Sequence, residues 1–132
     1  MSEDLQATVL LTEHIWLDRG RFSLLGIGPT RAFPGRMRLS AMVIVGVRPR
    51  MVRSSFALTI ELYAKDDPAH IVAHDTIQLE GEAPSQEALI PDLVQVLSPV
   101  RLEADLAPST MYVLQVRNDD EILTSTYFVT GP

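Results

Sequence analysis

Two histidines and an aspartate form a group with the composition of a metal or catalytic site. His70, His74 and Asp75 fall close together in the sequence. On a β-strand, positions i and i+4 share a face but lie about 13 Å apart, which is too far for one zinc ion. On a helix they would be adjacent, but no Glu follows the first His, as a zinc-protease motif requires. We interpret both histidines as ordinary strand residues, and His14 in the same way.

Two acidic turns contain oxygen ligands that calcium accepts. They supply Asp66, Asp67, Asp119 and Asp120. Calcium takes six to eight oxygens, and neither segment has the alternating ligands of an EF-hand loop. Asp and Asn also stabilise tight turns through hydrogen bonds to their own backbone. We expect ordinary turns and no metal, and keep a ligand- or calcium-binding domain with these acidic end loops as the alternative function.

The sequence contains no motif for nucleophilic catalysis or for a cofactor. It has no Cys and no Gly-x-Ser-x-Gly elbow. Gly26 and Gly28 are not a dinucleotide fingerprint, because the third glycine is missing and no helix is predicted after them. We therefore expect a protein that is not an enzyme and binds no cofactor.

The charges are distributed unevenly along the chain, whose net charge is -6. Residues 19–53 contain eight of the eleven basic residues and no acid, whereas residues 54–132 contain thirteen of the seventeen acids. In one interpretation, the basic segment packs beside acidic strands and surface ion pairs neutralise it, each contributing about 0–1 kcal/mol.

Two other interpretations give the arginines a partner. If they cluster at one end of the molecule, a bipolar surface favours head-to-tail contact with further copies or with an acidic protein. Eight arginines could also neutralise phosphates, but the acidic balance and the few aromatic residues nearby argue against nucleic acid.

The apolar pattern that must position these residues is typical of strands throughout. Alternating segments are separated by turn signals, and no segment has a sustained helical period. Residues 31–36 are predicted as a loop. Residues 87–105 are ambiguous: a helical turn near 86–90, an edge strand over 92–97 interrupted at Pro99, then 100–103. The other predicted strands cover residues 6–17, 21–27, 37–47, 54–64, 70–79, 111–117 and 122–129.

This pattern predicts one all-β domain over residues 1–132, an antiparallel immunoglobulin-like β-sandwich of seven to eight strands. The segment 37–47 is apolar on both faces in its second half, which indicates a central strand covered on both sides, or an interface. Tyr112 follows a polar turn, as in the tyrosine corner of sandwich folds. Trp16 is expected to be a core or inter-sheet anchor.

The sequence contains a Gly-basic-apolar hairpin, a Leu-Leu-Gly-Ile segment, a Phe-Pro loop, a Tyr-x-x-x-Val strand and an aromatic-Val strand: Gly20-Arg21-Phe22, residues 24–27, Phe33-Pro34, residues 112–116 and Phe128-Val129. Together these short motifs resemble an uncharacterised family of short bacterial β-sandwich proteins of unknown function. Gly35-Arg36 departs from the family pattern, which has a His-Pro or similar step. The resemblance implies a β-sandwich and gives no catalytic residue.

We therefore expect a non-enzymatic module that acts through protein–protein contacts, with copies of itself as the expected partner. Arginine and aromatic residues dominate interface hot spots. The predicted contact residues are Arg31, Phe33, Arg36, Arg48, Arg50 and Arg53. The acidic N-terminus is not a signal peptide, and no apolar run is long enough to span a bilayer, so we expect a cytoplasmic protein without membrane contact.

Overall fold

The computed structural model describes residues 5–27, 31–47, 56–79 and 94–132 of the chain. These residues form nine strands and no helix, and therefore no helix that could cross a membrane. The strands are β1 (Leu5–Asp18), β2 (Arg21–Ile27), β3 (Arg31–Ala32), β4 (Gly35–Val47), β5 (Phe56–Ala64), β6 (Ile71–Leu79), β7 (Val94–Leu106), β8 (Met111–Asn118) and β9 (Glu121–Thr130).

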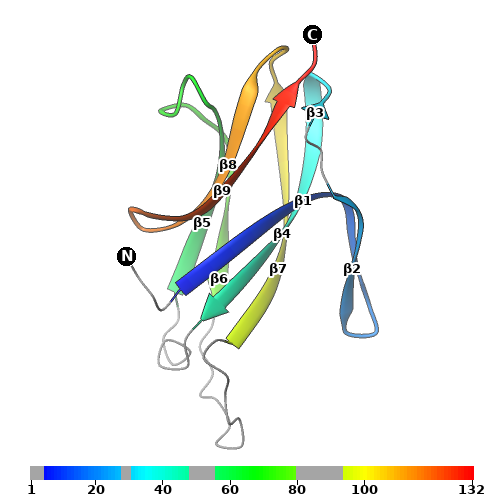
Figure 1. The fold of residues 1–132 in the computed structure, drawn as a ribbon, viewed down its shortest axis with the longest axis vertical. Helices are drawn as coiled ribbons and strands as arrows, with labels where there is room; N and C mark the ends of the chain where they lie inside the picture. Colours follow the sequence, from blue (N-terminus) through cyan, green and yellow to red (C-terminus); the bar gives the residue numbers. More distant parts are fainter. Residues whose placement is uncertain (1–4, 28–30, 48–55, 80–93) are drawn as a thin grey trace, which may run out of the picture.

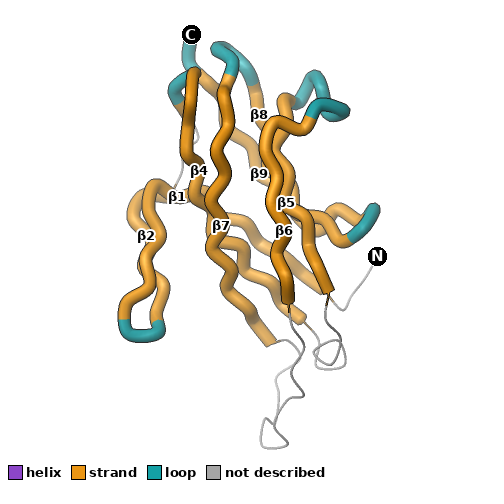
Figure 2. The backbone as a smooth tube through the Cα atoms, turned by 180° about the vertical axis from the view of Figure 1, so that it is seen from behind, coloured by secondary structure: helices purple, strands orange, loops and turns teal. Residues whose placement is uncertain are grey.

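Two sheets pack face to face, which confirms the predicted immunoglobulin-like β-sandwich (Figure 1). The predicted number of seven to eight strands is too low, because the described residues alone form nine. The four-stranded sheet has the order β2-β1-β4-β7 and the five-stranded sheet the order β3-β9-β8-β5-β6. The short strand β3 belongs to the other sheet from both β2 and β4, and the chain changes sheets again between β4 and β5, between β6 and β7, and between β7 and β8. By this order β4 and β7 correspond to strands B and E of that fold, and β5, β8 and β9 to C, F and G. Figure 2 shows β6 and β7 side by side at one edge of the sandwich.

The core lies between the sheets and follows from the alternation of the sequence. Leu58, Ile60 and Leu62 of β5 are fully buried, whereas Thr59 and Glu61 between them are partly exposed. Because successive side chains of a strand point to opposite faces, this is the half-buried pattern predicted for this strand. The central strand β4 contributes Ala41, Val43, Val45 and Val47, and other strands complete the cluster with Val9, Leu11, Val100, Leu102, Leu114, Val116 and Phe128.

The second half of β1 leaves the four-stranded sheet together with β2. β1 pairs with β4 as far as Thr12, and beyond this point β2 is its only partner among the strands that the structure describes. Arg19 and Gly20 join the two strands with positive φ angles of 53° and 75°, as a two-residue hairpin turn requires. This ribbon, residues 13–24, is called the arm below, and Figure 1 shows it beside the sandwich.

The predicted loop over residues 31–36 is wrong at both ends. Arg31 and Ala32 form β3, which pairs in parallel with the C-terminal part of β9, and β4 already begins at Gly35. The pairing of β3 with β9 is a contact between distant segments, and local alternation cannot indicate a strand of two residues. Gly35 has a φ of 103°, a backbone conformation that glycine adopts without strain.

The predicted break at Pro99 is also wrong. β7 continues through Pro99 as one strand of 13 residues, paired with β4 along its whole length. β7 is the edge of its sheet, and proline is tolerated in an edge strand because no outer neighbour requires its missing N–H. The helical turn expected near residues 86–90 lies outside the described residues.

Tyr112 forms the predicted tyrosine corner between β7 and β8. The backbone N–H of Ala107 donates to Tyr112 Oη at 2.7 Å, and the ring stacks on Phe128 with a centroid distance of 5.6 Å. Thr130 Oγ1 accepts from the N–H of Thr110 at 2.8 Å and donates to the carbonyl of Ala107 at 2.6 Å. Two buried side chains therefore satisfy the backbone of this connection.

Candidate functional site

The outer face of the five-stranded sheet contains a row of three side chains from three strands. Arg31 of β3 is directly opposite Val129 of β9, and Val129 is directly opposite Met111 of β8. Strands lie about 4.8 Å apart, so these side chains are close neighbours. Because the adjacent residues Ala32 and Tyr112 are buried in the core, alternation directs the row to the outer face.

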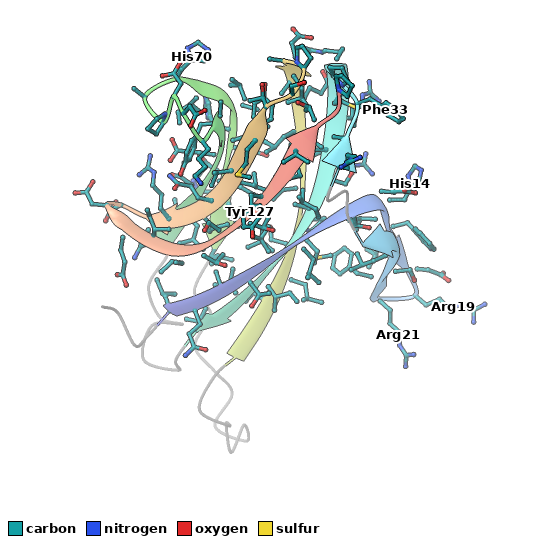
Figure 3. All side chains as sticks on the ribbon, turned by 45° about the horizontal axis from the view of Figure 1, so that its top comes forward. His14, Arg19, Arg21, Phe33, His70 and Tyr127 are labelled. Atoms are coloured by element: carbon teal, nitrogen blue, oxygen red, sulfur yellow. The ribbon has the colours of Figure 1, made fainter. Side chains whose placement is uncertain are left out.

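A second row lies beside the first on the same face. Tyr127 of β9 is opposite Val113 of β8, which in turn is opposite Tyr63 of β5. Tyr127 is 66% exposed, and Figure 3 shows it on β9. Val113 and Tyr63 are partly buried. The two rows together are called the apolar patch, which consists of Arg31, Tyr63, Met111, Val113, Tyr127 and Val129.

The neighbouring part of this face is a polar network that begins at the patch. Tyr63 Oη donates to Gln115 Oε1 at 3.0 Å, and Gln115 Nε2 donates to Glu61 Oε1 at 3.5 Å. Arg117 donates from Nε to the same oxygen of Glu61 and from Nη1 to the carbonyl of Asp119 at 2.6 Å. The network holds the hydroxyl of Tyr63 and so fixes one border of the patch.

Glu61 is the acidic side chain of this network, and only 12% of it is exposed. The hydrogen bond from Arg117 lowers the pKa of Glu61 below its ordinary value, and the positive charge of Arg117 acts in the same direction, against the opposing effect of burial. The same ion pair raises the pKa of Arg117. Glu61 is therefore an ionised structural partner of Arg117.

Two of the predicted contact residues lie together at the end of the sandwich where β4 begins. Arg31 belongs to the apolar patch and forms no ion pair with another described residue. Phe33 follows β3 and is 81% exposed, and Figure 3 shows it directed away from the sheets. This end of the molecule therefore presents both an arginine and an aromatic side chain to solvent.

Arg36 lies on the other sheet and has acidic partners there. Its guanidinium binds Glu103 at 3.0 Å and Asp105 at 3.5 Å, and Arg38 binds Glu103 at 2.8 Å. Hydrogen bonds from Arg36 and Arg38 lower the pKa of Glu103. The interpretation that the basic segment pairs with acidic strands therefore holds for these two arginines.

The remaining predicted contact residues, Arg48, Arg50 and Arg53, lie outside the described residues. Val47 ends β4, and it is separated from Arg36 by nearly the whole of that strand, about 36 Å at 3.3 Å per residue. The contact role of these three arginines stays a prediction.

The two acidic turns do not meet, so the expected grouping of both turns at one end is wrong. Asp66 and Asp67 follow β5 beside the first residue of β8, where the N–H of Lys65 donates to the carbonyl of Met111 at 2.9 Å. Asp119 and Asp120 follow the last residue of β8, about 24 Å away along that strand. One calcium ion cannot bind both turns.

The histidine group is also spread apart. His70 lies in the turn before β6, where its N–H donates to the carbonyl of Asp67 at 3.1 Å. His74 is opposite Glu61 on the outer face, and Asp75 is opposite the buried Ile60, so these neighbours point to opposite faces. Within residues 5–27, 31–47, 56–79 and 94–132, no three His, Asp or Glu side chains are grouped for a metal ion.

Trp16 is not the predicted core anchor, because it lies on the arm and is 46% exposed. Two buried side chains lie outside the main core: Met42, which is 2% exposed on the outer face of β4, and Ile15 of the arm. The arm therefore covers part of this face, as expected for a strand that is apolar on both sides. An open groove of about 730 Å³ remains between the arm and the sandwich edge, lined by Ile15, Trp16, Leu17, Phe22, Asp75, Pro99 and Arg101.

Tyr127 and Met111 were not predicted as surface residues. Both occupy strands that were predicted correctly, at positions alternate to the buried Phe128 and Tyr112. The alternation of residues 111–117 and 122–129 contained this signal. Their meeting with Arg31 could not be predicted, because it depends on β3.

No family model matches this sequence, and no curated protein matches it either. A glycosyl hydrolase family 2 member from Bacteroides cellulosilyticus is 14% identical over 76% of this chain, with a TM-score of 0.45. A β-glucuronidase from glycoside hydrolase family 2 is 8% identical over 96%, with a TM-score of 0.48. This chain spans 12% and 11% of the length of those two proteins. Its own strand order, rather than these similarities, establishes the fold.

Proposed function

We propose that this chain is a non-enzymatic interaction module that binds protein and associates with further copies of itself through the apolar patch. The observation that carries this proposal is the pair of cross-strand rows, in which Arg31 and Tyr127 border the apolar side chains of Met111, Val113 and Val129. Tyrosine, methionine and arginine are enriched in protein interfaces, and exposed apolar patches on soluble proteins mark interaction sites.

The rigid setting of the patch also supports a binding role. Its side chains stand on paired strands, and the hydrogen bond from Tyr63 to Gln115 holds one border in place. A preformed surface loses less conformational entropy when it binds than a surface that must first become ordered.

The solution mass tests this proposal. We expect light scattering after size exclusion to give a mass above 14.6 kDa that rises with protein concentration. In about 0.5 M NaCl, where exposed charges are screened within a few Å, part of this association should persist, because the centre of the patch is apolar. A mass of one chain at every concentration and in both buffers would contradict self-association.

A further inference from the structure

The arm also presents exposed apolar side chains to solvent. Leu17 and Trp16 are 63% and 46% exposed, and Leu17 is opposite Phe22 across the ribbon. Beyond Thr12, β1 has lost its pairing with β4, so the arm is a two-stranded ribbon whose free end is accessible. Figure 3 shows Arg19 and Arg21 at this end, directed away from the sandwich.

Acidic and basic residues follow one another in opposite order along the arm and across the apolar patch. Along the arm, Glu13 lies at the base, the apolar residues follow, and Arg19 lies at the tip. Asp18 is opposite Arg21, so Arg19 is the cation of the tip that has no acid opposite it. The distance from Glu13 to Arg19 along an extended chain is about 20 Å.

Across the patch, the order runs from a cation to a turn with a net negative charge. Arg31 stands on β3 at one side. At the other side Lys65 lies beside Met111 and is followed by Asp66 and Asp67, so one base and two acids give this turn a net charge of -1. Three strand spacings, about 14 Å, and the width of the turn separate these charges. An arm laid across the strands would therefore place Arg19 near the two aspartates and Glu13 near Arg31.

One molecule cannot make this contact with itself. The groove shows that the arm lies against the four-stranded sheet, near Pro99 and Arg101 of β7. The patch lies on the outer face of the other sheet, with the core between them. A contact between an arm and a patch is therefore heterologous, and a pair of copies retains one free arm and one free patch to which further copies can add.

We infer that the partner of the apolar patch is the arm of a second copy, and that the chain associates head to tail. This inference rests on the proposed function, because it names the surface that the patch binds. Leu17 and Phe22, which share one face of the ribbon, contact Tyr127, Val129 and Met111, and the terminal charges fix the direction of the arm.

A charge exchange tests the pairing. The arm variant R19D/R21Q makes the tip acidic, and Asp tolerates the positive φ that Arg19 adopts. The turn variant D66K/D67K makes the other end of the patch basic. Each variant alone sets like charges against each other, and we expect its dissociation constant to rise about tenfold or more. An equimolar mixture restores opposite charges at every contact, and its mass should return to that of the wild type.

A second pair of variants tests the same contact without charge. Leu17→Ser removes an apolar side chain from the arm and keeps the patch, whereas Tyr127→Ser does the reverse. Each alone should stay monomeric at concentrations at which the wild type associates. Their mixture should form one heterodimer and nothing larger, because only one intact arm and one intact patch remain.

The outcomes separate the inference from the proposed function. Wild-type protein that stays monomeric overturns both. Two results overturn the arm-to-patch contact and leave self-association through other surfaces. In the first, all four variants associate as strongly as the wild type. In the second, each variant alone is monomeric but the mixtures remain monomeric too. Circular dichroism and thermal melting of each variant show that it is folded before its mass is interpreted.

Discussion

Tyr127 lies directly opposite Val113 on the outer face of the five-stranded sheet, and two thirds of its side chain are exposed to solvent. In an antiparallel pair, side chains in direct register contact each other across the strands. The ring of Tyr127 therefore stands at the border of the apolar patch, where it can be covered by a partner without rearrangement of the sheet.

Removal of this ring should weaken association without unfolding the protein. We expect Tyr127→Ser to raise the dissociation constant about tenfold or more, since truncation of a tyrosine at an interface hot spot typically costs about 2 kcal/mol or more. Ile122→Ser is the matched control, because Ile122 is 59% exposed on the same strand but lies outside the patch. Sedimentation equilibrium of both variants measures the difference, and equal dissociation constants would exclude the patch.

Arg31 and Arg36 should differ in their effect on association. Arg31 has no described acidic partner and belongs to the patch, whereas Arg36 is bound to Glu103 and Asp105. We therefore expect Arg31→Ser to weaken association and Arg36→Ser to leave it unchanged. The same sedimentation experiment decides, and a larger effect of Arg36→Ser would favour an interface on the four-stranded sheet.

The tyrosine corner should contribute measurably to stability. Tyr112→Phe removes the buried hydroxyl that accepts the N–H of Ala107, and loss of one such hydrogen bond typically costs about 0.5–1.5 kcal/mol. Urea unfolding of the wild type and of Tyr112→Phe measures this loss. Tyr63→Phe is the control, since its hydroxyl bonds only to the partly exposed Gln115, and we expect it to lower the free energy of unfolding by less.

The ion pair of Glu61 predicts a specific pH dependence. Arg117 holds the pKa of Glu61 below its ordinary value of 4.5. Because the pKa is lower in the folded state, the contribution of Glu61 to stability is complete above the unfolded pKa and is lost as the pH falls through the folded pKa. The difference in free energy of unfolding between the wild type and Glu61→Gln should therefore be larger at pH 7 than at about pH 3.

Urea unfolding at both pH values gives this comparison. Glu103→Gln is the matched control, because Glu103 also pairs with arginines but is 46% exposed, and exposed pairs contribute little. A difference for Glu61→Gln that is the same at both pH values would show that the ion pair adds nothing to stability.

Much of the fold could be predicted because each strand carries its own alternation. The buried Leu58, Ile60 and Leu62 repeat with period two, and Gly20 marks the hairpin turn that the structure contains. The tyrosine corner could be predicted from Tyr112, because its hydroxyl accepts a hydrogen bond from backbone only five residues upstream. These features are local, so a single sequence contains enough information to predict them.

The errors come from contacts between distant segments. β3 exists because Arg31 and Ala32 meet β9, and β7 passes through Pro99 because it is an edge strand beside β4. Trp16 is exposed because β1 leaves its sheet after Thr12. The candidate site has the same origin, since Arg31 and Tyr127 are brought together by strand order rather than by their spacing.

Amide spectra recorded by nuclear magnetic resonance over a concentration series test the central claim most directly, because they locate the contact as well as detect it. We expect concentration-dependent shifts to cluster on Arg31, Met111, Tyr127 and Val129 and on residues 16–21 of the arm, while Leu58 and Leu114 in the core stay constant. Spectra that do not change with concentration, or shifts confined to other surfaces such as the face of Arg36 and Glu103, would contradict the claim.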